Sequence, residues 1–432
     1  MSPDIRDAAA SRADELDADR VGLHYKGLAP TLPDDSVGHL VRRRPALVEA
    51  GFNFPLLVLS RSALEHNATA MSQFCRRHGV QLAPHGKTTM SPELHALQVR
   101  EGAWGLTAAT IHQVGVYRRF GVSRIILANE LVDEAALLWV ARELERDPGF
   151  TLYCFVDSVE GVELMGHALR EATGQPPRAL VEVGYPGGRA GCRDLGTVRA
   201  VAQSVVAEPG LSLAGVGGYE GLIGHDRDPA TVQAVTSFVR FVRDAAETVL
   251  DSPGSAAPGD FVVTCGGSAY FDIVVDELVH RWTRAAETTT VLRSGSYLTH
   301  DDGLYESVSP LIRAGTGALR PALHVWAHVL STPEPRRAIV GAGRRDVPFD
   351  SGLPRPQLVW RRGEVRPSPL PGAGTTDIND HHLYLDLQGD DAQVGDLVGF
   401  GISHPCTAFD KWRLIPVVDD DWRIVDCVHT YF

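Results

Sequence analysis

The stretch Val80 to Lys87, VQLAPHGK, leaves a short apolar run through a Pro-His-Gly turn and ends on a lysine. A helix start follows at Ser91-Pro92-Glu93, where a serine can cap the helix and a proline suits its first turn. Strand, turn and helix in this order form the repeating unit of a parallel α/β fold. In a barrel built from such units, Lys87 would lie at the mouth, where these folds keep their catalytic groups.

The same unit recurs along the chain. We predict strands at the apolar runs Leu56 to Leu59, Val80 to Ala83, Gly105 to Thr107, Arg124 to Leu127, Leu152 to Val156, Ala179 to Val183, Leu213 to Val216, Phe261 to Thr264 and Thr290 to Leu292. Amphipathic segments such as Ser62 to Arg77 and Thr231 to Leu250 fill the intervals and read as helices. Because this strand–helix unit repeats about eight times, we predict a (β/α)8 barrel over residues 51–300.

The pattern changes after about His300, where helical periodicity fades. Pro- and Gly-rich turns, Ser331 to Arg336 and Gly363 to Thr376, separate alternating runs. These runs are His381 to Leu387, Leu397 to Ile402 and Arg413 to Val418. We therefore predict a mainly antiparallel β domain over residues 301–432. Residues 1–50 are polar and irregular and are left unassigned beyond a possible short helix.

Composition excludes several classes of protein. The 432 residues are 44% hydrophobic, and 41 Lys and Arg against 54 Asp and Glu give a net charge of −13, which argues against nucleic acid as a partner. The acidic N-terminus has no apolar stretch typical of a secretory signal, and no apolar run is long enough for a membrane span. The six cysteines are scattered without a C-x-x-C pair. We expect a cytoplasmic protein with reduced thiols.

Lysine is scarce, since Lys26, Lys87 and Lys411 are the only ones in the chain. A desolvated lysine at a barrel mouth can lose its proton and form a Schiff base, although a solvated loop lysine is the plainer interpretation. When the Val80 run is counted as the first barrel strand, two glycine-rich turns follow the seventh and eighth strands: Thr264 to Ser268 and Arg293 to Ser296. Barrels commonly hold phosphate at these two positions. A reactive lysine and a phosphate site on one rim together point to pyridoxal 5′-phosphate.

At this point the sequence resembles a known family. Five short motifs carry the resemblance: Pro84-His85-Gly86-Lys87-Thr88, Gly188-Arg189-Ala190-Gly191, Gly218-Tyr219, Gly266-Gly267-Ser268 and His404-Pro405-Cys406. In this order they are similar to the D-serine dehydratase and D-threonine aldolase group of fold type III pyridoxal phosphate enzymes. The resemblance covers about residues 50–430 and implies an alanine racemase-like barrel with a β domain. It departs from the commoner R-P-H-x-K-T-H-K pattern, which appears here as Ala83 to Met90, and Gly184 stands where an aspartate is usual. These departures point to the amino acid deaminase-like branch.

The resemblance also implies roles for individual residues. Lys87 would carry the cofactor, Gly266, Gly267, Ser268 and Gly295 would hold its phosphate, and His404 and Cys406 would bind a divalent metal. On an extended strand, side chains two residues apart leave the same face, and N and S ligands suit zinc. His382 matches the family's E-H-G histidine and could move a proton or support a metal ligand. His85, Arg189, Tyr219 and Tyr297 are candidate contacts to the cofactor ring or a substrate carboxylate.

These residues predict a pyridoxal phosphate- and metal-dependent lyase. It would remove water and ammonia from a D-β-hydroxy amino acid and leave a 2-keto acid, with Lys87 taking the Cα proton. Three alternatives stay open: D-threonine aldolase-type cleavage of the Cα–Cβ bond, an amino acid racemase, and a non-catalytic pyridoxal phosphate carrier. The family further implies a homodimer in which a second β domain closes the barrel mouth.

Overall fold

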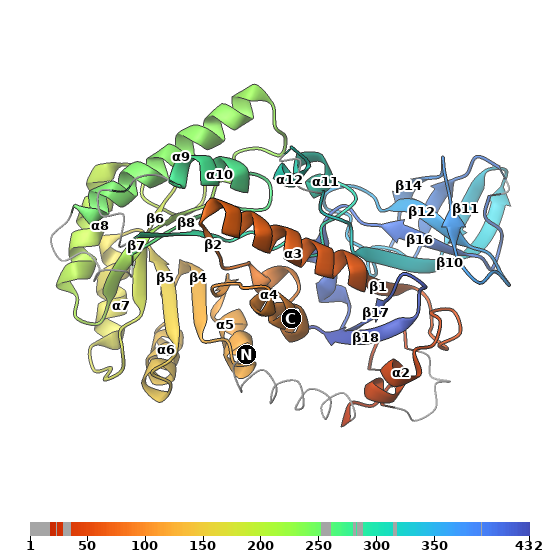
Figure 1. The fold of residues 1–432 in the computed structure, drawn as a ribbon, viewed down its shortest axis with the longest axis horizontal. Helices are drawn as coiled ribbons and strands as arrows, with labels where there is room; N and C mark the ends of the chain where they lie inside the picture. The colour runs from red at the N-terminus through yellow and green to blue at the C-terminus, as the bar shows by residue number, and fades with distance from the viewer. Residues whose placement is uncertain are drawn as a thin grey trace.

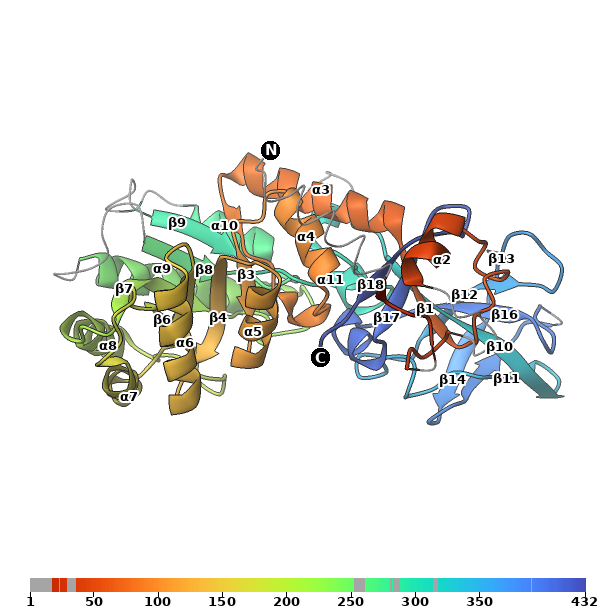
Figure 2. The ribbon, with the colours of Figure 1, turned by 90° about the horizontal axis from the view of Figure 1, so that it is seen from below.

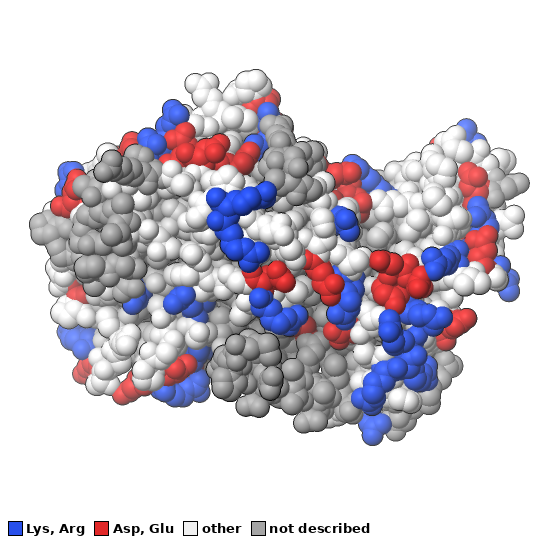
Figure 3. All heavy atoms as spheres, viewed as in Figure 1, with Lys and Arg blue, Asp and Glu red and all other residues white. Residues whose placement is uncertain are grey.

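The computed structural model describes residues 18–22, 24–28, 36–251, 261–279, 282, 288–313, 318–389 and 391–432. Two sheets build two domains that lie side by side (Figure 1), and one hydrophobic cluster runs through both of them. Within the described residues, no helix is long and apolar enough to cross a membrane. All six cysteines are free thiols. Lys and Arg are interspersed with Asp and Glu on the face shown in Figure 3.

The first domain is one curled sheet of eight parallel strands, which confirms the predicted α/β barrel. The strands are β2 (Gln81–Leu82), β3 (Leu106–Ala108), β4 (Arg124–Glu130), β5 (Thr151–Val156), β6 (Arg178–Val183), β7 (Ser212–Gly218), β8 (Phe261–Cys265) and β9 (Thr288–Leu292). Their order is β2-β9-β8-β7-β6-β5-β4-β3. A parallel bridge between His85 and Thr107 joins the two ends of this sheet, so Lys87 lies directly beyond the closure.

Helices cover the outside of the barrel: α3 (Arg61–His78), α4 (Pro92–Arg100), α5 (Ile111–Arg119), α6 (Glu134–Arg146), α7 (Val159–Leu169), α8 (Leu195–Ala207), α9 (Pro229–Leu250) and α10 (Phe271–Leu278). Most begin where a Ser, Thr or Asp side chain accepts a hydrogen bond from a first-turn N–H, as Asp133 does for α6 and Asp228 for α9. Each such cap stabilises its helix by about 1 kcal/mol. α9 buries Val235, Val239, Val242 and Ala246, a spacing that places one apolar face on the sheet.

The second domain is a ten-stranded, mainly antiparallel sheet (Figure 2). Its strands are β1 (Leu56–Ser60), β10 (Leu323–Glu334), β11 (Arg337–Val340), β12 (Arg355–Trp360), β13 (Ser368–Pro369), β14 (Gly374–Ile378), β15 (Leu383–Asp386), β16 (Leu397–Gly401), β17 (Leu414–Val418) and β18 (Ile424–His429). The main path runs β13-β12-β16-β10-β1-β17-β18, and β11, β15 and β14 extend it from β10. The predicted β domain after residue 300 is present.

β1 is a correction to the sequence analysis, which placed residues 56–59 in the barrel segment 51–300. The strand lies in the middle of the second sheet, antiparallel to β10 and parallel to β17. Its first four residues are fully buried, as in a barrel strand, so an apolar run of this length reads the same in either sheet. The chain then crosses to the barrel through α3 (Figure 1).

Short helices connect the remaining elements. α2 (Val37–Arg43) is the short helix expected in the first 50 residues, and α11 (Leu304–Val308) and α12 (Pro310–Arg313) lead from the barrel into β10. Three 3-10 turns, η1 (Gly86–Thr88), η3 (Pro405–Thr407) and η4 (Phe409–Lys411), lie near the junction of the two domains. The backbone N–H of Tyr431 donates to Met90 O, which ties the C-terminus to the segment after Lys87. Residues 1–17, which hold most of the acidic N-terminal stretch, lie outside the described residues.

Candidate active site

Lys87 lies on η1, just after the closure of the barrel at its carboxyl end. A Cβ on the preceding Gly86 would come within 2.5 Å of the Tyr117 hydroxyl and 2.7 Å of His95 Nε2, so only glycine allows this turn. Burial lowers the pKa of Lys87 below its ordinary value, and Arg189 and Arg293 lower it further, against the opposing effect of Cys406. Lys87 therefore loses its proton more easily than an ordinary lysine.

Two cavities of about 240 and 320 Å³ meet at Lys87. Their shared lining residues are His85, Lys87, Arg189, Tyr219, Gly267 and Arg293. The smaller cavity lies over the barrel strands, and the larger one extends to the second domain, where His404 and Cys406 line it. A site between domains with a few polar groups and a perturbed lysine has the form of a small-molecule site.

The predicted contacts His85, Arg189 and Tyr219 all line both cavities. His85 Nδ1 is buried and has no hydrogen-bond partner within the described residues. Burial, together with Lys87 and Arg293, holds the pKa of His85 well below its usual value, so the ring is neutral. The Arg189 guanidinium lies 4.9 Å from the centroid of the Tyr219 ring, and burial raises the pKa of Tyr219 to about 12. These groups form a polar wall around the lysine.

Arg293 is a site residue that the sequence analysis quoted only as part of a turn. Its guanidinium is buried and donates to Thr264 Oγ1 at 2.9 Å and to Gly218 O at 2.6 Å. It follows β9 directly, so its place at the end of a barrel strand was the available signal. Glu182 lines the smaller cavity and forms a side-chain hydrogen bond with Glu130. Burial has the largest effect and Glu130 adds to it, and together they raise the pKa of Glu182 to about 9. One carboxyl of this pair is therefore protonated at neutral pH.

The first glycine turn differs from its prediction. The N–H groups of Gly266 and Gly267 donate to the carboxylate of Glu220, at 3.1 and 2.6 Å, and Cys265 Sγ lies 3.0 Å from the same group. Glu220 is fully buried and directly follows Tyr219, a position that the sequence analysis passed over. These two amides are thus already satisfied by a side chain. Ser268, Gly295 and Ser296 line the larger cavity, which leaves this rim for a phosphate.

Gly295 provides a tight cradle at that rim. A Cβ at this position would lie 2.3 Å from His85 O, so a side chain would push the two turns apart. Ser294 Oγ donates to the carbonyls of Gly266 and Gly267, which locks the two glycine turns together. A cradle that only glycine permits, the unpartnered His85 Nδ1 and a lysine with a lowered pKa fit pyridoxal phosphate.

His404 and Cys406 face each other; Cys406 lies on the 3-10 turn η3 rather than on a strand, whereas His404, the residue before that turn, has the extended backbone that we predicted. β16 ends at Gly401, and the turn η3 brings the two side chains together. Burial lowers the pKa of His404, but Cys406 and Asp350 outweigh it and raise the value to about 9. Burial also raises the pKa of Cys406, and the hydrogen bond and charge of His404 lower it overall.

Asp350 orients this pair, and sequence reasoning did not find it. Its Oδ2 lies 2.5 Å from His404 Nδ1, and its Oδ1 accepts from the Thr407 hydroxyl at 2.8 Å. His404 Nε2 is therefore the ring nitrogen left for Cys406 or a metal. An N and an S donor with such a carboxylate behind the histidine fit a transition-metal site with open positions. Among the residues that the structure describes, no group of three or more His, Cys, Asp and Glu forms a ligand set.

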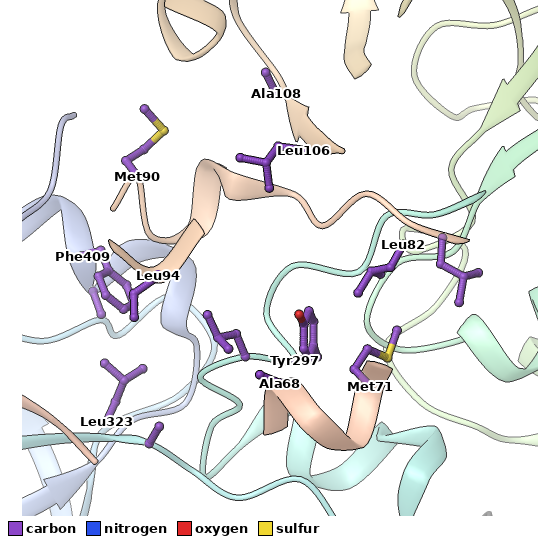
Figure 4. Close-up of a cluster of buried hydrophobic side chains, with 14 of the residues drawn as sticks. Ala68, Met71, Leu82, Met90, Leu94, Leu106, Ala108, Tyr297, Leu323 and Phe409 are labelled. Atoms are coloured by element: carbon purple, nitrogen blue, oxygen red, sulfur yellow. The ribbon is translucent and has the colours of Figure 1, made fainter. Parts of the chain in front are cut away.

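Two predicted residues lie away from both cavities. Tyr297 is buried in an apolar cluster with Ala68 and Met71 (Figure 4), where Gln98 Nε2 donates to its hydroxyl at 3.2 Å. His382 is exposed on the turn between β14 and β15, and it lines neither cavity. Tyr305 was not predicted, yet it lines the larger cavity from α11, with its ring 6.5 Å from that of His404.

Comparisons with known proteins agree with this fold. Residues 59–258 match the alanine racemase N-terminal domain, and residues 322–418 match the putative serine dehydratase domain. The chain is 30% identical over 347 residues to a D-threonine aldolase of Arthrobacter sp, covering 79% of this chain and 82% of that protein. It is 26% identical over 352 residues to the D-threo-3-hydroxyaspartate dehydratase of Delftia sp. (strain HT23), covering 79% and 86% of the two chains.

Solved structures share the fold. The D-threonine aldolase of Filomicrobium marinum superposes with a TM-score of 0.75 at 23% identity, over 89% of this chain and 95% of that chain. A cysteine-to-alanine variant of a D-threo-3-hydroxyaspartate dehydratase, described as being in the metal-free form, gives a TM-score of 0.70 at 22% identity, over 88% and 97%. The barrel, the added sheet and the lysine define a fold type III pyridoxal phosphate enzyme with an alanine racemase-like fold. The chain belongs to the family of D-serine dehydratase-like and D-threonine aldolase-like lyases.

Proposed function

We propose that this lyase removes water and ammonia from a D-β-hydroxy amino acid and leaves a 2-keto acid, using pyridoxal phosphate and a divalent metal. One observation carries the proposal. Lys87, from the barrel, and the His404–Cys406 pair, from the second domain, line the same cavity of about 320 Å³. A substrate seated there would meet a base at its Cα and a metal site at its β-hydroxyl.

Lys87 would hold the cofactor through its Nζ, and the rim of Ser268, Gly295 and Ser296 would hold the phosphate. When bound, pyridoxal phosphate supplies an electron sink for the electrons left at Cα. Lys87 is also placed to take the Cα proton, and burial, by lowering its pKa below that of an ordinary lysine, makes the neutral amine needed for this role easier to reach. Arg189, whose guanidinium has no hydrogen bond or ion pair within the described residues, is placed to receive a carboxylate.

His404 and Cys406 would hold the metal, which supplies Lewis acidity that makes hydroxide a better leaving group. Zinc is our choice because imidazole and thiolate are its usual ligands. Asp350 fixes the His404 ring by its contact at Nδ1, so Nε2 stays aimed at one position. The metal-free form described for a cysteine variant of a solved relative supports a metal in these enzymes.

Retro-aldol cleavage is the second candidate reaction, because the relative with 30% identity is named a D-threonine aldolase. Product analysis separates the two reactions. Incubation of the holoenzyme with D-threonine or D-threo-3-hydroxyaspartate should release ammonia and a keto acid in equal amounts. Glycine and an aldehyde as the main products would assign the aldolase reaction instead. A product that differs from the substrate only at Cα would indicate a racemase.

Borohydride reduction tests the cofactor site. We expect purified protein to be yellow and reduction to fix the cofactor to the peptide that contains Lys87. Lys87→Ala should remove both colour and turnover, while Lys411→Ala, whose side chain pairs with Asp410 at 3.8 Å, should keep both. Label on Lys26 or Lys411 would contradict the assignment. Any turnover would exclude a non-catalytic carrier.

Chelation tests the metal site. EDTA should abolish turnover without bleaching the yellow colour, because Lys87 and the His404–Cys406 pair come from different domains. His404→Ala and Cys406→Ala should reproduce the effect of the chelator. Full activity of protein shown to be metal-free would remove the metal from the proposal.

A further inference from the structure

The lining of the larger cavity limits which second group, besides the hydroxyl, the substrate can carry on its β-carbon. This inference rests on the proposed function, since it concerns the same cavity. A carboxylate buried in a cavity needs a cation beside it, so the cations that line this cavity limit how many carboxylates it can hold away from water. Among the described residues, the lining contains Lys87, Arg189 and Arg293 and neither aspartate nor glutamate.

Two of the three cations are already committed. Lys87 is needed for the cofactor, and the Arg293 guanidinium is held in place by Thr264 and Gly218. Arg189 remains, and it can pair with one carboxylate, which the α-carboxylate of any amino acid substrate provides. The described part of the cavity wall therefore offers no arginine or lysine for a second carboxylate.

The cavity wall beyond the proposed metal ligands has an apolar part, although Thr88, Ser296 and Tyr305 lie next to His404 and Cys406 themselves. Leu304 and Val308 line the cavity from α11, and their spacing of four residues places them on one helix face. The N–H of Leu304 donates to Ser403 O at 3.3 Å, which holds this face next to the turn that carries His404. Leu222, from the loop after β7, lines the same cavity and is 48% exposed. A group on the substrate's β-carbon would lie between these side chains.

We propose that the substrate's β-substituent is uncharged and apolar, a branched alkyl or aryl group, and that Leu304 and Val308 select it. Burying a carboxylate against this wall would leave it without a partner, whereas an alkyl or aryl group would bury apolar area on both sides. His225, in the loop after β7, is an exposed titratable side chain that lines the same cavity. A protonated His225 could pair with a carboxylate on the substrate's β-carbon, so His225→Ala is included in the experiment.

Binding is measured first, with D-amino acids that lack the β-hydroxyl and cannot eliminate water. The change in cofactor absorbance of the holoenzyme gives the dissociation constants of D-phenylalanine, D-leucine and D-aspartate. We expect the two apolar ligands to bind at least about tenfold more tightly than D-aspartate. Equal or tighter binding of D-aspartate, or a D-aspartate affinity that disappears in His225→Ala, would overturn the proposal.

Turnover is measured next, with threo-3-phenylserine, 3-hydroxyleucine and D-threo-3-hydroxyaspartate. The apolar substrates should have the higher kcat/KM, again by about tenfold or more. Leu304→Arg should reverse the order for both binding and turnover, because it places a cation on the wall. Leu164→Arg, at a 42% exposed position on α7, is the matched control and should leave the order unchanged.

The two proposals fail separately. If the products are glycine and an aldehyde, the dehydratase assignment is wrong. The order of substrate preference still tests whether Leu304 and Val308 select an apolar β-substituent. If reduction does not label Lys87, the proposed function falls as a whole. If Leu304→Arg folds, keeps its cofactor and leaves the order of ligands unchanged, the selecting role of Leu304 is wrong.

Discussion

Asp350 is a side chain whose effect on the site is transmitted through another residue. It contacts His404 Nδ1 and Thr407 rather than the cavity centre, and it is recognisable only when the turn after β16 is folded. Its carboxylate sets the orientation of the imidazole. Together with Cys406, it also raises the pKa of His404. Such a contact tunes a ligand's basicity and direction.

Asp350→Asn should therefore weaken metal binding by about 10- to 100-fold while leaving cofactor absorbance unchanged. Competition with a chromogenic chelator measures the affinity. Asp244→Asn, at a position on α9 with a 58% exposed side chain, serves as the control. Unchanged affinity in Asp350→Asn would show that His404 needs no orienting carboxylate.

The Glu182–Glu130 pair makes stability depend on pH. Burial and then Glu130 raise the pKa of Glu182 from its usual 4.5 to about 9, so the folded state keeps a proton that the unfolded chain has released. This contribution to stability is fully present below pH 4.5 and is lost as the pH rises through about 9. The folded protein should lose stability across this range on account of this group.

Glu182→Gln should remove that loss. Urea unfolding of the cofactor-free protein at pH 6 and pH 8.5 should show a smaller drop in midpoint for Glu182→Gln than for the unaltered chain. Glu163→Gln, on the exposed face of α7, should behave like the unaltered chain. The same drop in Glu182→Gln would mean that the pair does not hold a shared proton.

Individual residues also show what the sequence could predict of the site. Lys87 was predictable because it is one of three lysines and ends a barrel strand. Glu220 was not, because its partners, the amides of Gly266 and Gly267, lie 46 and 47 residues away in the chain. Tyr297 follows a barrel strand like the true lining residues, yet its side chain turns into the cluster beside α3. Strand position places a residue at the rim but does not fix the direction of its side chain.

At the scale of elements, the order of strands in the barrel was predictable, but the sheet to which β1 belongs was not. Alternation of apolar runs and amphipathic helices identifies the barrel because each unit is local. β1 pairs with β10 and β17, whose sequences lie hundreds of residues further on, and no local pattern records such pairing. The His404–Cys406 turn was missed for a related reason, since a short 3-10 turn has no periodicity to detect.

The position of β1 predicts how fragments behave. A fragment of residues 301–432 lacks the strand between β10 and β17, which would leave two unpaired edges in the middle of a sheet. We expect it to be unfolded or aggregated, and a version that also carries residues 36–60 through a flexible linker to be folded. Circular dichroism and amide-proton dispersion distinguish the two. A well-folded fragment without residues 36–60 would show that β10 and β17 pair without β1.

At the scale of the whole molecule, Lys87 remains reachable by solvent through the cavities that it lines. An exposed site of this kind would lose its carbanion to stray protonation, so we predict that a second copy covers the mouth in a homodimer. An obligate interface of this kind buries more than about 2,000 Å² in total. Sedimentation at nanomolar concentration should show a dimer. A stable monomer with full specific activity would mean that each chain completes its own site.

The place of β1 in the sheet also sets a timetable for synthesis. Leu56–Ser60 leaves the ribosome early, and its neighbours Leu323–Glu334 and Leu414–Val418 follow roughly 260 and 350 residues later. At about 5–20 residues per second, an unpaired strand with four consecutive apolar residues waits for tens of seconds. The nascent chain is thus exposed to aggregation for most of its translation, and His404 and Cys406 reach Lys87 only when synthesis is nearly complete. Slow codons after the codon for Ser60 should therefore reduce the yield of soluble enzyme more than the same number of slow codons before the codon for Leu56.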